Sequence, residues 1–125
     1  MGNKSHKTKS NNNYGKLILI GDINVGKTSI VKRFIFNQFK DNNNKTNIFV
    51  YYKKTIKLNN NQDFNFNIWD TFGQEKFRAL AKVFYHDCVI AILVYDITSK
   101  KSFENIKNYW WEELKKNAQN SCTSK

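Results

Sequence analysis

The chain has 125 residues, two cysteines and a formal net charge of +11 at pH 7. This length allows at most one compact domain, and no apolar run reaches the roughly 18 residues that a membrane-spanning helix needs. Residues 1–15 contain no apolar stretch like that of a signal peptide. Cys88 and Cys122 lie far apart and indicate neither a disulfide framework nor a zinc site. We therefore expect a cytosolic protein in a reducing compartment.

The positive charge is concentrated toward the N-terminus. Residues 1–16 carry four lysines and no acidic residue, which leaves +7 on the other 109 residues. We expect a disordered basic tail at 1–13, a partial domain at 14–117 and a second disordered tail at 118–125. Such charge favours an anionic surface, lipid or nucleic acid, or it is simply a solvated surface. Because no aromatic-basic platform or recognition motif is present, we expect no nucleic-acid partner.

Hydrophobic periodicity predicts strands at 16–20, 47–57, 63–70 and 88–95, and helices at 27–38, 75–85 and 102–117. The segment 88–95 is apolar throughout, which is typical of a strand covered on both faces of a parallel sheet. Residues 63–68 alternate between polar and apolar, as in a more exposed strand. Ser102 is the expected N-cap of the last helix, whose apolar positions are Phe103, Ile106, Trp110 and Leu114. This order, with one hairpin, predicts an α/β sandwich with a mostly parallel sheet.

The segment Gly21–Thr28, GDINVGKT, fits G-x-x-x-x-G-K-S/T and follows the first predicted strand. A glycine-rich turn from a strand into a helix directs backbone N–H groups at one spot, where the helix N-terminus adds positive potential. Lys27 would reach the outer phosphates, and the Thr28 hydroxyl would ligate Mg²⁺. A chance match is the alternative, but the position between strand and helix favours a phosphate site. The predicted nucleotide-binding residues here are Gly21, Asn24, Val25, Gly26, Lys27, Thr28 and Ser29.

The segment 68–75, IWDTFGQE, resembles the signature W-D-T-A-G-Q-E of the small GTPases, most closely the Rab family. The resemblance implies that Asp70 holds Mg²⁺ through a water, that the Gly73 N–H senses the γ-phosphate and that Gln74 orients the attacking water. An ordinary turn after a strand is the alternative. Two phosphate motifs in this order favour the resemblance.

Other segments extend the resemblance over about residues 14–116. RFIFNQF at 33–39, followed by Thr46, is similar to the first switch, which implies that Phe39 packs on the base and Thr46 closes over Mg²⁺ and γ-phosphate. KFRAL, FYHDC and LVYDITSKKSF look like later blocks of the family. Rab proteins carry an effector-facing aromatic triad, and the matching positions are Tyr51, Trp69 and Phe84, for which core packing is the alternative.

Several departures from the family pattern bear on activity. Ile23 in the loop and Phe72 beside Gly73 replace small residues, and we expect slow hydrolysis. No N-K-x-D or S-A-K motif follows Leu114, so guanine preference cannot be read from the sequence. The resemblance therefore implies a small-GTPase sandwich that lacks its last strands and helices, with an unpaired edge and uncovered apolar surface beside 88–95. A truncated gene, a splice form or a fragment would explain this.

The resemblance implies a monomeric GTP hydrolase that binds GTP and GDP with Mg²⁺ and recruits effectors in vesicle traffic. An exchange factor and a GTPase-activating protein would be its regulators. Two alternatives remain open. One is a truncated fragment that does not hydrolyse nucleotide, which is either an interaction module or a gene product without function. The other is an adenine-nucleotide enzyme with the same phosphate loop.

Two chain ends bear on membrane attachment. Gly2 could carry a myristoyl group, although the motif has His6 where Ser or Thr is expected. The second signal that one acyl chain needs would come from the nearby lysines Lys4, Lys7 and Lys9. Cys122 is fourth from the end, but the residues after it are not aliphatic, so we do not expect prenylation. We expect peripheral association with the cytosolic face of endomembranes, with a disordered basic tail as the alternative.

Overall fold

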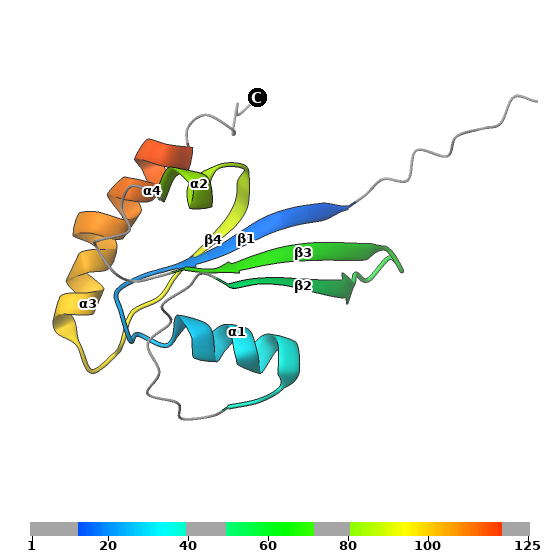
Figure 1. Cartoon of the computed structure of the whole chain (residues 1–125), viewed down its shortest axis with the longest axis horizontal. Helices are drawn as coiled ribbons and strands as arrows, with labels where there is room; N and C mark the ends of the chain where they lie inside the picture. The colour runs from blue at the N-terminus through cyan, green and yellow to red at the C-terminus, as the bar shows by residue number, and fades with distance from the viewer. Residues whose placement is uncertain (1–12, 40–49, 72–80, 119–125) are drawn as a thin grey trace, which may run out of the picture.

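The computed structural model describes residues 13–39, 50–71 and 81–118. Its strands are β1 (Tyr14–Ile20), β2 (Val50–Lys57), β3 (Asp63–Asp70) and β4 (Cys88–Leu93). The helices are α1 (Lys27–Phe36), α2 (Ala81–Tyr85), α3 (Lys100–Asn105) and α4 (Trp111–Ala118), and a π-helical turn, η2 (Ile106–Trp110), joins the last two. Figure 1 shows α1 on one face of the sheet, and α2, α3 and α4 on the other.

The four described strands form one sheet in the order β2-β3-β1-β4. β1 pairs in parallel with β3 and β4, whereas β2 and β3 form an antiparallel hairpin. The hairpin turns at 58–62, where Asn61 adopts a positive φ of 58° that asparagine tolerates. The predicted α/β sandwich, mostly parallel with one hairpin, is confirmed.

The core lies on both sides of β1, because successive side chains of a strand point to opposite faces. Leu19 packs with Val31 of α1 and Ile68 of β3 on one face. Ile18 and Ile20 pack on the other face against Tyr85 and Trp110. The central position of β1 therefore explains why its last three residues are fully buried.

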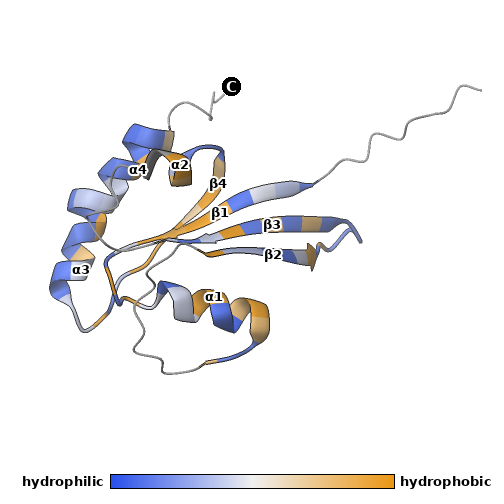
Figure 2. Ribbon diagram, in the orientation of Figure 1, coloured by the Kyte–Doolittle hydropathy of each residue, from blue (hydrophilic) through white to orange (hydrophobic). Residues whose placement is uncertain are grey.

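The strand expected at 88–95 was predicted to be covered on both faces, and this is wrong for β4. The side chains of Val89, Ile90 and Ile92 are 66%, 39% and 39% exposed. Within the described part of the chain β4 is the edge of the sheet, paired only with β1. Figure 2 shows hydrophobic colour along β4 and hydrophilic colour over much of α3 and α4. The expected unpaired edge with uncovered apolar surface is thus present in the described structure.

The predicted helix at 102–117 begins earlier, because Ser99 and not Ser102 is its N-cap. The Ser99 side chain accepts a hydrogen bond from the Ser102 N–H. Ser102 lies inside the first turn, where its buried hydroxyl donates to the carbonyls of Asp96 and Ser99. Phe103, one of the four apolar positions expected on this helix, is 56% exposed and packs against the ring of Tyr95.

The helix predicted at 27–38 is α1, which ends at Phe36 because Asn37 adopts the left-handed conformation that stops a helix. Of the helix predicted at 75–85, the structure describes α2 from residue 81 onward. Most of the expected N-terminal tail and all but the first residue of the expected C-terminal tail lie outside the described residues. Among the described helices, none is long and apolar enough to cross a membrane.

Candidate nucleotide site

The segment after β1 forms a turn that leads into α1, and two of its glycines are required by its geometry. Gly21 has a φ of 152°, and a Cβ there would lie 2.1 Å from the carbonyl oxygen of Val94. Gly26 caps α1 with a φ of 101°. Side chains strongly disfavour both conformations. The backbone conformation therefore requires glycine at both positions, independently of the phosphate site that the motif predicts.

The sheet brings the loop and the end of β3 together. Leu19 pairs with Asp70 and Ile20 with Leu93, so the carboxyl ends of three parallel strands meet beside the loop. Ligands in open α/β sheets bind at this edge. Among the other predicted loop residues, Asn24 is exposed at its tip with a φ of 62°, and Val25 and Ser29 are half-buried.

Lys27 is the first residue of α1 and is almost fully buried. Its Nζ donates to the carbonyl oxygens of Gly21, over 2.9 Å, and Asp22, over 2.7 Å. Burial lowers the pKa of Lys27 to about 8, although the carboxylates of Asp70 and Asp22 act in the opposite direction. The loop thus folds back on the lysine, and its carbonyls are the groups that hold the ammonium.

Thr28 and Asp70 form the second polar contact of the site. Thr28 Oγ1 donates to Asp70 Oδ2 over 2.6 Å. Asp70 is fully buried, and its Oδ1 has no hydrogen-bond partner in the described structure. Burial raises the pKa of Asp70, which the hydrogen bond from Thr28 and the charge of Lys27 partly offset. A buried carboxylate oxygen without a partner is costly unless a ligand completes it.

The oxygens of Thr28 and Asp70 fit Mg²⁺, a hard cation that takes oxygen ligands. The described residues include no group of three His, Cys, Asp or Glu side chains that could hold a metal ion. A cation here would therefore need further oxygens from another source. Phosphate oxygens next to the loop amides would supply them.

The three aromatic residues of the predicted effector surface are in contact. The Trp69 ring lies 5.7 Å from Tyr51 and 6.0 Å from Phe84, both edge to face. Tyr51 is 41% exposed, whereas Phe84 is buried, so Tyr51 and Trp69 present the accessible part. The effector role of the three residues stays a prediction.

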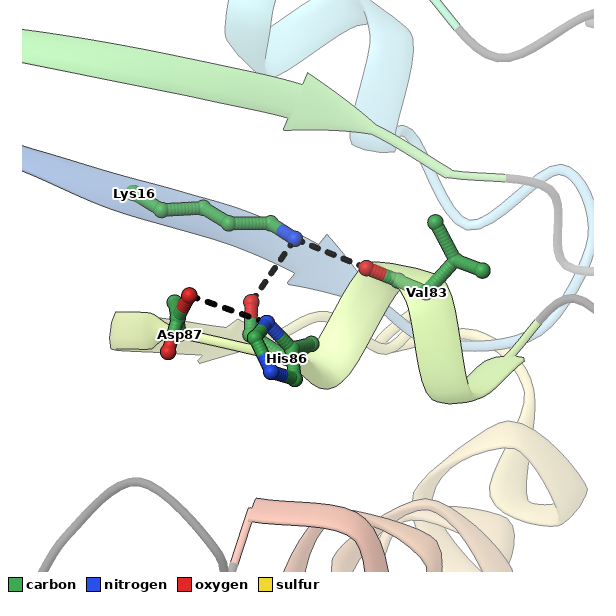
Figure 3. A network of polar contacts seen from close by, with 4 residues as sticks. All are labelled: Lys16, Val83, His86 and Asp87. Carbon is green, nitrogen blue, oxygen red and sulfur yellow. Dashed lines mark hydrogen bonds and ion pairs between the residues drawn. The ribbon is translucent and has the colours of Figure 1, made fainter.

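The sequence interpretation missed the contacts of two residues: Lys16, which lies beside the Trp69 ring, and Asp22, which lies in the loop. Figure 3 shows the Lys16 Nζ donating to the carbonyls of Val83 and His86 at the end of α2, both over 2.9 Å. The same Nζ lies 4.2 Å from the centre of the Trp69 ring, and burial lowers the pKa of Lys16. A lysine at the start of an apolar strand was the only sign of this contact in the sequence.

The structure does not bring every predicted residue to the site. Phe39 follows α1 and is 65% exposed. Ile23 is 38% exposed at the loop tip. Thr46, Phe72, Gly73 and Gln74 lie outside the described residues, so their predicted roles remain predictions.

A mostly parallel sheet, a glycine-constrained loop leading into α1 and a buried lysine beside a buried aspartate together define an α/β domain with a phosphate-binding loop. The model of the Ras family matches residues 16–124, and the chain belongs to this family.

Individual relatives carry Ras- and Rab-related names. The chain is 41% identical over 116 residues to Ras-related protein RHN1 of Nicotiana plumbaginifolia, covering 93% of this chain and 55% of that protein. It is 46% identical over 100 residues to human Ras-related protein Rab-22A, covering 80% and 50%. A probable Rab-related GTPase of Acanthamoeba polyphaga mimivirus is 39% identical over 111 residues, covering 89% and 51%. The chain therefore spans about half the length of the curated relatives that it matches.

Proposed function

We propose that this chain is a Rab-type switch that binds GTP and GDP with Mg²⁺ and hydrolyses GTP in vesicle traffic. The observation that carries the proposal is the pairing of a buried lysine and a buried carboxylate at the phosphate loop. Among the described residues, Lys27 Nζ is held by two backbone carbonyls and Asp70 Oδ1 has no hydrogen-bond partner. Both groups are suited to a bound phosphate and its cation.

Lys27 is the residue that changes partners on binding. Its pKa of about 8 keeps most of the population protonated at pH 7. A phosphate oxygen is a better acceptor for an ammonium than the two neutral carbonyls that now hold it. Lys27 would therefore leave Gly21 and Asp22 for the outer phosphates, and the amides of the loop would face the same charge.

Thr28 and Asp70 would hold Mg²⁺, Thr28 directly and Asp70 through a water, with Thr46 as a further predicted ligand. The chemistry that Mg²⁺ supplies when bound is neutralisation of charge on the phosphates. Gln74 is proposed to orient the attacking water and Gly73 to sense the γ-phosphate. We expect slow turnover without an activating protein, and Ile23 at the loop tip is the residue that would crowd its approach.

The partners follow from the same proposal. Effectors would contact the aromatic surface of Tyr51 and Trp69, and an exchange factor would reload the loop. Peripheral membrane attachment through an acyl group at Gly2 and the basic tail is proposed from the sequence alone. A second candidate, an interaction module that does not hydrolyse nucleotide, is favoured by the exposure of Tyr51 next to Trp69.

The test is Mg²⁺-dependent binding of a fluorescent GTP analogue to the 125-residue chain, competed in turn with GTP, GDP and ATP. Submicromolar binding that only guanine nucleotides displace would support the switch, and phosphate release would then measure hydrolysis. Equal displacement by ATP would indicate an adenine-nucleotide enzyme. A folded chain that binds no nucleotide would favour the interaction module.

A further inference from the structure

The carboxylate of Asp22, inside the phosphate-binding loop, is held by two side chains from the far end of the chain. The Asn105 side-chain amide donates to Asp22 Oδ2 over 2.7 Å. The indole N–H of Trp110 donates to Asp22 Oδ1, also over 2.7 Å. Each carboxylate oxygen thus receives one short hydrogen bond, and bonds of this kind to a charged group are the stronger ones. We call Asp22, Asn105 and Trp110 the Asp22 clamp.

The π-helical turn η2 explains how two residues five positions apart reach one carboxylate. In a regular α-helix, at 3.6 residues per turn, positions five apart point about 140° away from each other. In η2 the Trp111 N–H donates to the Ile106 carbonyl five residues earlier, so the turn is wider. A wider turn brings Asn105 and Trp110 toward the same side of the helix. π-helical turns are rare in proteins as a whole, but those that occur often lie at functional sites.

Asp22 also contacts Lys27, through a different group. The backbone carbonyl of Asp22 accepts the shorter of the two hydrogen bonds from Lys27 Nζ, at 2.7 Å. The side chain of Asp22 is therefore anchored to the helical segment 105–110, while its backbone holds the lysine. Movement of this one residue would shift both the loop backbone and the lysine.

The indole of Trp110 is part of the core as well. It is 9% exposed and belongs to the same cluster as Ile18 and Ile20 of β1. Its position is thus fixed by packing before it donates to Asp22. A donor held in this way restricts the carboxylate more than a mobile surface side chain would, because less entropy is lost when the bond forms.

We propose that the Asp22 clamp positions the phosphate-binding loop for nucleotide, so that Asn105 and Trp110 set how long a nucleotide stays bound. The inference rests on the proposed nucleotide binding of the loop. With the clamp closed, the loop backbone is held in place when Lys27 transfers to phosphate. With the clamp broken, the loop must be ordered by the nucleotide itself, and release becomes faster.

Paired substitutions separate the clamp from its neighbours. Trp110→Phe keeps an aromatic ring in the core and removes the N–H donor, and Trp111→Phe is the matched control, since Trp111 is 45% exposed on α4. Asn105→Asp places a second carboxylate against Asp22, whereas Asn108→Asp makes the same charge change at an exposed position. Adding Asp22→Asn to Asn105→Asp exchanges donor and acceptor and restores a hydrogen bond between the two residues.

The measurement is the dissociation rate of a fluorescent GDP analogue from each 125-residue variant, with thermal unfolding followed by circular dichroism. We expect Trp110→Phe to release nucleotide about tenfold faster, as for a lost bond to a charged group. Asn105→Asp should release it about 30-fold faster because of like-charge contact. Trp111→Phe and Asn108→Asp should stay within about twofold of the unaltered chain. The double variant should recover to within about threefold, a rescue that general destabilisation would not produce.

The outcomes distinguish this inference from the function on which it rests. If the unaltered chain binds no nucleotide, both the proposed function and the proposed role of the clamp are wrong. If the unaltered chain binds nucleotide normally, and the folded variants Trp110→Phe and Asn105→Asp release it at the unaltered rate, only the proposed role of the clamp is wrong. If Asn105→Asp does not fold, the comparison of Trp110→Phe with Trp111→Phe decides the matter.

Discussion

The phosphate-loop end of the sheet and its β4 edge depart from the usual pattern of burial in opposite directions. At the loop end Lys27, Asp70 and Thr71 are polar and buried. At the β4 edge Val89 and Ile92 are apolar and partly exposed, although β4 pairs directly with β1, which leads into the loop. The first departure is typical of a ligand-binding site, and the second leaves apolar surface without a cover in the described part of the chain.

The physical costs of the two departures differ. Removing a charge from water is costly unless a partner replaces the water, so the loop end retains Lys27 and Asp70 at the expense of stability. Apolar surface that stays in water loses the stabilisation of about 25 cal/mol per Å² that burial would give. This penalty is smaller than that of a buried charge and is spread over a larger area. Substitutions at the loop end should therefore change ligand binding strongly, whereas substitutions at the edge should change association and leave the fold nearly unaltered.

Lys27→Ala should have the largest effect. The variant removes the only cation that the described structure places at the bottom of the loop, and truncating a buried charged contact costs several kcal/mol. We expect nucleotide affinity to fall at least about a thousandfold, measured by titration with the fluorescent GTP analogue. Lys101→Ala, an exposed lysine on α3, is the control and should bind normally. Normal affinity in Lys27→Ala would defeat the assignment of the site.

Asp70→Asn should have the next largest effect, mainly on the part of nucleotide affinity that depends on Mg²⁺. The amide keeps the shape of the side chain but removes the charge next to Thr28. We expect the gain in affinity that Mg²⁺ gives over EDTA to fall about a hundredfold, as for removal of a buried charged partner. Asp63 is exposed at the start of the same strand, and Asp63→Asn is therefore the matched control. If both variants respond equally to Mg²⁺, Asp70 does not hold the cation.

The pKa of Lys27 predicts a pH dependence of about tenfold. With a pKa of about 8, the protonated fraction of the free chain falls from about nine-tenths at pH 7 to about one-tenth at pH 9. Because phosphate binds the protonated form, nucleotide affinity should fall about tenfold over this range, measured by the same titration at each pH. A constant affinity between pH 7 and 9 would contradict the role of the lysine.

The same shift has the opposite effect on stability in the absence of nucleotide. Unfolding returns the pKa of Lys27 from about 8 toward 10.5, so between these values the unfolded chain binds more protons. The free energy of unfolding should therefore gain a contribution that rises with pH above about 8. Thermal unfolding of the nucleotide-free chain from pH 8 upward measures it, and the rise should be smaller in Lys27→Ala, where the lowered pKa of Lys16 still contributes.

The strands and the loop could be predicted from the sequence because their patterns are local. The alternation at 63–68 and the run G-x-x-x-x-G-K-T are each contained within a few residues, and the structure places β3 and the loop where those patterns indicate. The position of Asp70 beside Thr28 followed from the resemblance to the small GTPases. The structure supplies its physical basis, the parallel pairing of β1 with β3.

The burial of β4 and the partners of Asp22 could not be predicted, because both depend on distant parts of the chain. An apolar run such as 88–93 has the same sequence whether a neighbour covers it or not, so only the sheet order shows that β4 is an edge. Asp22 occupies a variable position of the motif, and its donors lie 83 and 88 residues away. The N-cap was assigned to Ser102 because it precedes the apolar residues, yet Ser99 has the extended backbone that a cap requires.

Val89→Lys tests the β4 edge and should have the smallest effect on the fold. Val89 is 66% exposed, so the substitution should change the free energy of unfolding by no more than about 0.5 kcal/mol. A lysine on an edge strand opposes pairing with another strand. We therefore expect less concentration-dependent self-association in sedimentation velocity. Val83→Lys makes the same change at a 58% exposed position on α2 and should leave association unaltered. If the two variants associate alike, the edge does not drive association, and its exposed apolar residues are simply tolerated in water.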